Sequence, residues 1–533
     1  MLLASATAAT LTVSCIQDAE DSSVLPQERL DEMSAEDPDK MLSATLSGMY
    51  SDLQSYVDED MSHNYFGQKS FDYLTSLMGN DMIMTGRYAM SLNHYMCNYW
   101  GQRNLATSNR WKEYYRVIAS ANSILKNIDP ETNNAKALAY RAQALTFRGY
   151  AYFQLTSLYQ FAYYTGADDT VWGKGDHYDW SEDMCVPIVL EHTQGDQPRS
   201  TVKEVYDQLI EDLETAYNLF ETLGMTKTPS VSDMDGCVAA LYLARANMVR
   251  HNWEDALKYA QVVIDNYPIL NTEAQILQGF STLSLPDVIF GCEITNDNTT
   301  VYMSWFSQMD MFGDGYAAIG VYRAGFKPFV DRIADDDIRL DWFWTSRNDE
   351  KLSEKFGQDS PGVEYQSCKF IGAGADNVEI IYDEDYDVYY GYGEGWELGA
   401  YIYLRSEEAY LMKAEILAHQ NKLSEAAAEL TQFMQTRCPS YSCDNVSSDK
   451  GKLIEEIIFQ KRVEFWGEGL EYLDNRRLNI PVDRTDETWG EDNNHLDGCK
   501  LNLEQENTKL RYQLPIAEIE NNKMISPADQ NSI

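Results

Sequence analysis

Along most of this chain, apolar residues recur every three to four positions, the spacing that places them on one face of a helix. Between 109 and 127 these positions include Trp111, Tyr114, Val117 and Ile118, and the pattern stops before Pro130. The same periodicity predicts helices at 39–56, 135–161, 238–250, 252–266, 404–420, 423–437 and 453–466 with its continuation to 477. We therefore expect a mostly α protein.

The predicted helices at 238–250 and 252–266 form a pair typical of a tetratricopeptide-like repeat. Such a hairpin of roughly 34 residues hides its apolar face only against the next hairpin. The first helix carries small residues that allow close packing, namely Ala239, Ala240, Ala244 and Ala246. The pair 404–420 and 423–437 repeats the pattern, so the sequence predicts a tetratricopeptide-like helical repeat scaffold.

Residues 271–400 interrupt the helical pattern. This segment is rich in Gly, Asp, Tyr and Trp, and it has weak strand signals at 288–294 and 379–382. Long irregular segments of ordered proteins usually carry functional loops. The predicted organisation is an N-terminal helical repeat region at 39–270, a large irregular, loop-rich insertion with a few short strands at 271–400, and a C-terminal helical region at 401–533.

The N-terminus has the order of a bacterial lipoprotein signal. Residues 2–14 are small and apolar, Cys15 follows, and 16–21 are acidic. We expect 1–15 to be a signal ending at a lipid-bearing Cys15, and 16–38 to be a flexible tether. Because no Lys or Arg precedes Cys15, the alternative is a disordered N-terminus with an incidental cysteine. No other stretch reaches the ~18 apolar residues needed to span a bilayer.

The net charge of −43, from 85 acidic and 42 basic residues, argues against nucleic acid as a partner. Nucleic acid binding depends on Lys and Arg that displace counterions from phosphates. Neutral sugars and peptides remain compatible with this charge.

Sequence motifs for catalysis and metal binding are missing. There is no G-x-S-x-G, H-E-x-x-H, Walker loop or G-x-G-x-x-G, so we expect a protein that is not an enzyme and has no cofactor. Structural Ca2+ is the alternative at the acidic clusters 335–337 and 383–387, where solvated charge is the favoured interpretation. Cys438 and Cys443 either form a small disulfide loop or remain buried thiols.

Five blocks resemble, in order, the motifs of the SusD/RagB family. They run from Arg141 to Tyr159, Arg199 to Ala216, Tyr403 to Glu415, Arg462 to Arg477, and Tyr512 to Ile519, with Gln530 and Asn531 at the end. The resemblance implies an outer-membrane lipoprotein of Bacteroidetes that closes as a lid over a SusC-like TonB-dependent transporter and captures glycans or, in some members, peptides. It also implies binding without hydrolysis, and residues 17–21 are similar to the family's surface-export signal.

The resemblance directs attention to the loop before the helix at 109, because starch-binding members contact sugar there. A sugar surface needs aromatic platforms beside planar hydrogen-bonding groups, since the ring stacks through its apolar face and the polar groups orient it. We predict Tyr99 and Trp100 as platforms, Arg87, Asn98 and Asn104 as hydrogen-bonding partners, and Tyr95, Trp305 and Tyr316 as further ligand contacts. The alternative for Trp100 is burial beneath the scaffold.

Together these features predict a lipid-anchored protein on the exterior of the cell outer membrane. It would bind a neutral oligosaccharide or polysaccharide and deliver it to the transporter. A peptide-capturing lid on the same fold and a repeat scaffold without a ligand are the alternatives. Exposed aromatic residues would favour sugar, a deep cavity with backbone-pairing groups would favour peptide, and a flat concave surface would favour the scaffold.

Overall fold

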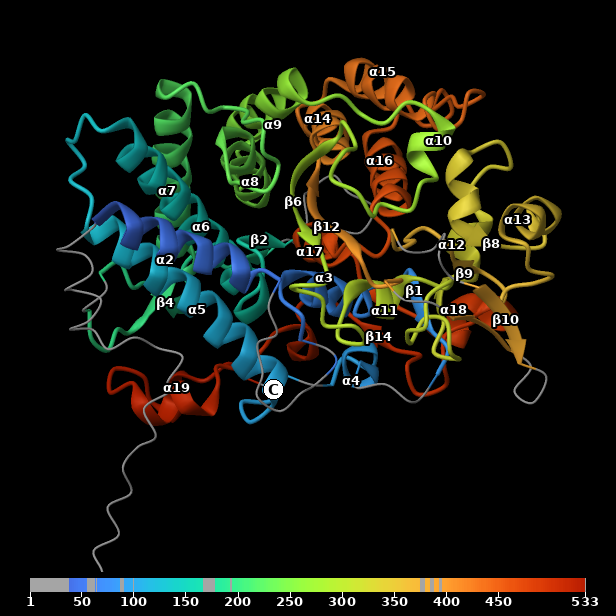
Figure 1. Ribbon diagram of the computed structural model, residues 1–533, viewed down its shortest axis with the longest axis horizontal. Helices are drawn as coiled ribbons and strands as arrows, with labels where there is room; N and C mark the ends of the chain where they lie inside the picture. Colours follow the sequence, from blue (N-terminus) through green and yellow to red (C-terminus); the bar gives the residue numbers. More distant parts are fainter. Residues whose placement is uncertain are drawn as a thin grey trace, which may run out of the picture.

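The computed structural model describes residues 38–54, 63, 65–86, 91–98, 100–165, 178–191, 194–373, 379–383, 388–392 and 395–532. The long helices form an array in which each packs on the next (Figure 1). Its first part is α5 (Leu105–Lys126), α6 (Ala135–Tyr159), α7 (Val202–Thr222), α8 (Gly236–Val249) and α9 (Trp253–Asn266), with α2 (Pro38–Asp52) against α5 and α6. Helix α9 then packs on α14 (Glu407–His419), which contacts α15 (Leu423–Met434) and α16 (Lys450–Glu464). The array is therefore continuous in space across the insertion that separates α9 from α14 in sequence.

Local sequence signals set the ends and the close packing of these helices. The Asn134 side chain accepts hydrogen bonds from the first backbone N–H groups of α6, and Thr201 and Glu204 form a capping box at the start of α7. Where α6 crosses α7, a Cβ added at Gly149 would lie 2.6 Å from Leu213 Cγ. A glycine at this position lets the two helices approach closely.

The strands are short, and several join distant parts of the chain. A four-stranded antiparallel sheet has the order β1 (Met82–Met84), β7 (Arg323–Gly325), β9 (Gln366–Ser367) and β8 (Phe343–Trp344). Strand β6 (Val288–Ile294) pairs with β12 (Gly399–Arg405), so the two ends of the irregular region lie together. The remaining two-stranded sheets pair β2 (Tyr164–Thr165) with β3 (Tyr178–Asp179), β4 (Met184–Pro187) with β5 (Arg199–Thr201), β10 (Glu379–Asp383) with β11 (Val388–Tyr392), and β13 (Val482–Asp483) with β14 (Asn502–Leu503).

Shorter helices make up the rest of the helical structure in the described ranges. The α-helices are α3 (Gln68–Ser76), α4 (Leu92–Tyr95), α10 (Glu273–Ile276), α11 (Trp305–Met309), α12 (Lys327–Asp331), α13 (Asp349–Phe356), α17 (Leu470–Leu478), α18 (Asp486–Trp489) and α19 (Ile516–Asn521). The 3-10 helices are η1 (Ile338–Trp342), η3 (Gly490–Asp492), η4 (Thr508–Leu510) and η5 (Pro527–Asp529). No helix in these described ranges combines the length and apolar character needed to cross a bilayer.

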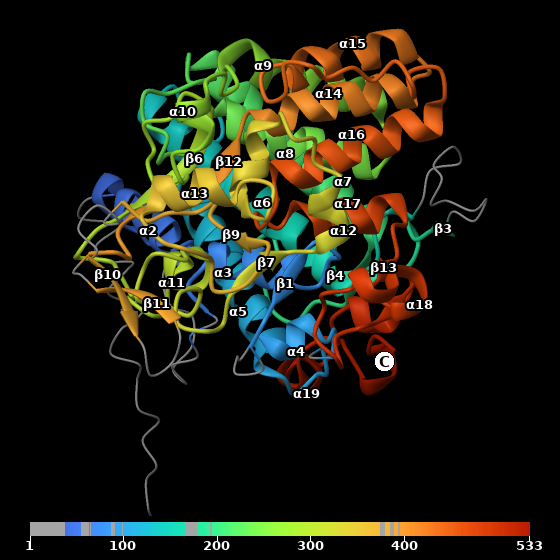
Figure 2. The same ribbon diagram turned by 90° about the vertical axis from the view of Figure 1, so that its right-hand side faces the viewer.

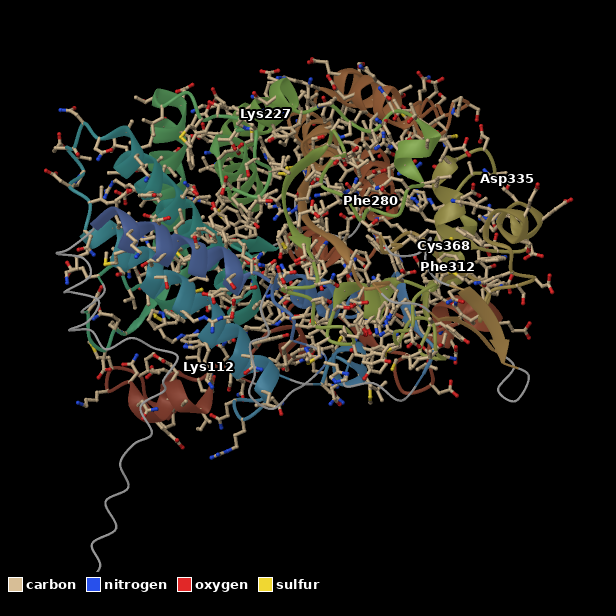
Figure 3. The ribbon with its side chains drawn as sticks, in the orientation of Figure 1. Lys112, Lys227, Phe280, Phe312, Asp335 and Cys368 are labelled. Atoms are coloured by element: carbon tan, nitrogen blue, oxygen red, sulfur yellow. The ribbon has the colours of Figure 1, made fainter. Side chains whose placement is uncertain are left out.

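A buried network of charges joins the irregular region to the C-terminal helices. We call Arg405, Lys369, Arg437, Glu464 and Glu468 the junction network. Arg405 Nη2 and Lys369 Nζ donate to Glu468 Oε1 over 2.9 and 2.7 Å, and Arg437 Nη2 donates to Glu464 Oε1 over 3.1 Å. The Arg405 guanidinium also lies 4.6 Å from the ring centroid of Phe280, which Figure 3 labels inside the molecule. Such buried charges are tolerated because each has partners of opposite sign.

The observed elements confirm the predicted fold class, a mostly α, tetratricopeptide-like scaffold with a few short strands. The predicted helix at 109–127 begins four residues earlier, at Leu105. The predicted helix at 404–420 begins only at Glu407, because residues 404–405 belong to β12. The strand signal at 288–294 coincides with β6.

Candidate ligand-binding surface

Trp100, the predicted central platform, is buried with 5% of its surface exposed. Its ring stacks on Tyr512 with a centroid distance of 4.6 Å and an interplanar angle of 18°, and the edge of His94 contacts it at 5.4 Å. A ring that is covered by other aromatic side chains cannot stack on a ligand. The prediction of a solvent-facing Trp100 is therefore wrong, and the burial alternative holds.

Tyr95 and Trp305 are also core residues rather than ligand contacts, with 0% and 1% of their surfaces exposed. The Tyr95 hydroxyl lies 2.7 Å from His495 Nδ1, and burial raises the pKa of Tyr95 above its usual value. The Trp305 ring packs edge to face on Phe370 at 5.0 Å, and Lys69 Nζ lies 4.4 Å from its centroid. Both expectations are corrected, because each aromatic ring fills the interior beneath the surface.

The polar residues predicted in the same loop have different positions. Asn98 is exposed, and Asn104 is half-buried at the N-cap of α5, where its backbone carbonyl accepts from Ser108 N at 3.2 Å. Arg87 and Tyr99 lie outside the described residues. Asn98 is therefore accessible and Asn104 partly so, and within the described part of the chain no hydrogen bond joins either side chain to an aromatic residue.

Tyr316 is half-buried, and it belongs to an aromatic group that the sequence did not single out as a whole. Its hydroxyl is 2.6 Å from His63 Nδ1, and the two ring centroids are 5.7 Å apart. Tyr302 is 42% exposed and its hydroxyl donates to Asp314 Oδ2 at 3.3 Å. We call Tyr302, Asp314, Tyr316 and His63 the insertion aromatic cluster; its residues Tyr302, Asp314 and Tyr316 lie on either side of α11 in the sequence.

The insertion aromatic cluster rests on a fixed base. The Tyr302 ring lies 6.1 Å from that of Trp396, which is itself 4% exposed, and a Cβ added at Gly313 would lie 2.6 Å from Trp396 Cε3. Ile319, at 48% exposure, adds an apolar side chain three residues after Tyr316. Burial raises the pKa of Asp314, while the hydrogen bond from Tyr302 lowers it in part. The insertion aromatic cluster therefore offers the exposed ring of Tyr302, the carboxylate of Asp314 and the imidazole of His63.

Two internal cavities cannot hold a sugar. One lies among Phe153, Arg245, Glu408 and Lys461 and the other among Gln68, Asp72, Arg110 and Glu468, with volumes of about 30 and 40 Å³. These volumes suit water molecules rather than a pyranose ring. Neither of these two cavities is therefore a candidate ligand site.

The acidic cluster 335–337, considered above for Ca2+, is occupied by protein contacts. Asp335 pairs with Arg347 at 3.1 Å near the periphery labelled in Figure 3, Asp336 accepts from Cys438 Sγ at 3.2 Å, and Asp337 pairs with Arg339 at 2.8 Å. Glu384, Asp385 and Asp387 lie outside the described residues. Within the described part of the chain, no three His, Cys, Asp or Glu side chains are arranged to hold a metal ion. Cys438 and Cys443 are separate buried thiols.

Comparison with known proteins matches residues 30–230 to the SusD-like_3 family model, described as starch-binding and associating with the outer membrane. A SusD-like carbohydrate binding protein from Bacteroides vulgatus shares 24% identity and a TM-score of 0.72, over 93% of this chain and 98% of that one. Surface glycan-binding protein A from Bacteroides thetaiotaomicron, solved with laminarihexaose, shares 14% identity and a TM-score of 0.64, over 91% and 98%. No curated protein matches the chain significantly.

The chain shares its helical-repeat fold with these SusD-like structures over nearly its whole length. Together with the match of residues 30–230 to the SusD-like_3 family model, this confirms the resemblance indicated by the sequence motifs.

Sequence reasoning missed Tyr302 and His63. Tyr302 closely follows the polar run Asn298–Thr299–Thr300, which signals a loop and hence exposure. His63 has no such signal, because its contact with Tyr316 joins two segments far apart in sequence.

Proposed function

We propose that this protein captures neutral glycans on the cell surface and passes them, without cleavage, to a TonB-dependent outer-membrane transporter. The observation that carries the proposal is an aromatic cluster on a SusD-like fold, in which Tyr302 is exposed and Tyr316, Asp314 and His63 are half-buried. The laminarihexaose complex of a protein with this fold supports a glycan as the ligand class.

The chemistry of the insertion aromatic cluster suits a neutral sugar. The exposed Tyr302 ring can cover the C–H face of a pyranose, and the Asp314 carboxylate and His63 imidazole can exchange hydrogen bonds with hydroxyls at its edge. The net charge of −43 opposes polyanionic ligands, so uronate-rich or sulfated glycans are disfavoured. The ligand we propose is therefore an uncharged oligosaccharide or polysaccharide.

The location and partner belong to the same proposal. The family description associates such proteins with the outer membrane, and the order of apolar run, Cys15 and acidic run suits a lipid anchor facing the exterior. Cys15 lies outside the described residues. We propose that lipid on Cys15 holds the protein beside a SusC-like transporter, and that the divisions at 38, 270 and 400 separate tether, repeat region, insertion and C-terminal region.

Affinity gel electrophoresis tests glycan capture. The purified protein is run through native gels containing starch, laminarin or mannan, beside the variants Tyr302→Ala and Tyr178→Ala. Tyr178 is a matched control because it is 46% exposed but lies on β3, far from the cluster in sequence. We expect one neutral polysaccharide to retard the wild type and Tyr178→Ala, with retardation reduced in Tyr302→Ala. Equal retardation of all three proteins would reject the cluster, and retention only by peptides would reject the glycan.

Anchoring and partnership need separate tests in cells. Radiolabelled palmitate is expected to label the wild type and not Cys15→Ser, and protease added to intact cells is expected to degrade the wild type. Affinity purification of the anchored protein is expected to recover a TonB-dependent transporter. Unlabelled wild type would reject the anchor, and recovery without a transporter would reject the partner.

A further inference from the structure

A surface hollow lies between α5, α19 and the segment that follows β4. Its volume is about 390 Å³, within the roughly 300–1,000 Å³ typical of small-molecule sites. In both ribbon views α19 lies below α5 (Figures 1 and 2). Residues of both helices line the hollow. We call it the α5–α19 pocket, and the residues used below are Trp111, Tyr115, Gln194, Asp196, Glu518 and Asn521.

Two aromatic rings on α5 form a rigid floor for the α5–α19 pocket. The centroids of Trp111 and Tyr115 lie 4.7 Å apart at an interplanar angle of 39°, and Trp111 also packs against the edge of Tyr159 at 5.0 Å. The Tyr115 hydroxyl donates to the Pro187 carbonyl at 2.7 Å, which fixes the ring against the wall. The floor is therefore set before any ligand arrives.

The polar walls are fixed by hydrogen bonds between α19 and the segment 194–197. Asn522 Nδ2 donates to Gln197 O at 2.8 Å and to Glu518 Oε1 at 2.7 Å, and Lys523 N donates to Asp196 Oδ2 at 3.2 Å. Within the described part of the chain, the second oxygen of each carboxylate makes no hydrogen bond. Glu518 and Asp196 thus each keep an acceptor for a ligand.

The charge of the walls selects among ligands. Carboxylates and amides line the pocket, and none of its described lining residues is Lys or Arg. Burial chiefly raises the pKa of Tyr115, and the negative charge of Glu518 is among the smaller causes. An anionic ligand would meet repulsion without a compensating cation.

We propose that the α5–α19 pocket binds one neutral pyranose residue, with its C–H face over the partly exposed ring of Tyr115 and its hydroxyls donating to Glu518 and Asp196. Trp111, which is 7% exposed, supports the Tyr115 ring from within the protein. This site is separate from the insertion aromatic cluster and rests on the proposed function only for the ligand class. It would give the protein a second contact with a branch or chain end, and two linked contacts raise the apparent affinity for a long glycan.

Ligand-observed saturation-transfer NMR on the full chain tests the proposal. The probes are the methyl glycosides of glucose, galactose and mannose. Methyl glucuronide is the anionic comparison, and Nα-acetyl-lysine amide, which keeps its side-chain ammonium, is the cationic comparison. Two variants alter the pocket: Glu518→Gln removes an acceptor charge, and Asn521→Trp fills the opening from an exposed position. Glu520→Gln on the same helix is the matched control, since Glu520 is exposed and does not line the pocket.

We expect one neutral methyl glycoside to bind, with affinity reduced about tenfold by Glu518→Gln through loss of a charge-assisted hydrogen bond. Asn521→Trp is expected to abolish binding, and Glu520→Gln and Tyr302→Ala to leave it unchanged. The pocket assignment is overturned if no neutral glycoside binds, if both pocket variants bind like the wild type, if methyl glucuronide binds equally well, or if only the cation binds.

The two proposals can fail separately. Polysaccharide retardation that depends on Tyr302, with no glycoside in the pocket, would support the insertion aromatic cluster and overturn the second site. A glycoside that Asn521→Trp displaces, with no effect of Tyr302→Ala on polysaccharide binding, would support the pocket and overturn the role of the cluster.

Discussion

Glu468 is expected to stabilise the fold through the junction network, and its contribution can be worked from the structure. Burial alone would raise the pKa of this carboxylate, but the charges of Arg405 and Lys369 outweigh it and lower the pKa from 4.5 to about 2. A difference of about 2.5 pKa units corresponds to roughly 3 kcal/mol. Because the folded pKa is the lower one, this stability is present above the unfolded pKa of 4.5 and is lost as pH falls towards 2.

The Glu468–Lys369 pair contributes less than roughly 3 kcal/mol to the free energy of unfolding, because burial disfavours the charged form of Lys369. Burial lowers the pKa of Lys369 to about 8, although the negative charge of Glu468 favours the protonated ammonium and opposes this change. Holding the ammonium inside the protein therefore costs free energy. Removing Glu468 leaves that cost uncompensated. We therefore expect Glu468→Gln to reduce the free energy of unfolding at pH 7 by about 3 kcal/mol, as for other broken buried pairs.

Urea unfolding monitored by circular dichroism measures this loss. The matched control is Asp39→Asn, which breaks the exposed Lys136–Asp39 pair, whose side chains are 60% and 56% exposed; little change is expected there. The difference between wild type and Glu468→Gln should also shrink as the pH is lowered below 4.5. A loss below 1 kcal/mol at pH 7, or a loss that does not depend on pH, would refute the reasoning.

Three further outcomes follow from particular contacts. Tyr302 exposes 42% of its surface, which is roughly 80 Å² for a tyrosine, and covering this area with a sugar at about 25 cal/mol per Å² contributes about 2 kcal/mol. Isothermal titration should therefore show that Tyr302→Ala binds the retained glycan roughly 30-fold more weakly than the wild type. Trp100→Ala should lower the free energy of unfolding by about 3–5 kcal/mol through the cavity beside Tyr512, with the glycan affinity of the folded protein unchanged in the same titration. Gly149→Ala should destabilise the protein by about 1–3 kcal/mol in urea unfolding, because the new Cβ would lie 2.6 Å from Leu213 Cγ; a neutral effect would show that α6 and α7 can separate freely.

The helices could be predicted because their apolar faces repeat locally, and the strand at 288–294 because it is a continuous run of β-prone residues. The four-stranded sheet could not. Its strands β1 and β7 have three residues each and pair across a large sequence separation, so neither has a periodicity to detect. Short strands of this kind are set by tertiary packing.

The site was harder to predict than the fold because exposure depends on distant residues. Trp100 sits in a loop whose composition suits sugar binding, yet Tyr512 from near the C-terminus covers its face. Tyr302 has a less suggestive neighbourhood, but Trp396 supports its ring from below and leaves the outer face to solvent. Composition identifies candidate platforms, whereas the packing partner decides which of them reaches water.

The blocks that carry the family resemblance explain why the fold was easier to predict than the site, because their charged residues pair with one another inside the protein. Arg148 of the first block donates to Asp212 of the second at 2.7 Å, and Arg405 of the third donates to Glu468 of the fourth at 2.9 Å. Arg477 of the fourth block donates to Glu415 of the third at 2.7 Å.

These pairs hold α6 to α7 and the end of β12 to the C-terminal helices, so the motifs specify how the scaffold assembles. Tyr302 and Tyr316, like the residues named in the α5–α19 pocket, lie outside all the blocks except for Glu518. A chain can therefore keep every motif and still change its ligand, since the residues that fix the fold and those offered to the glycan are almost entirely different sets.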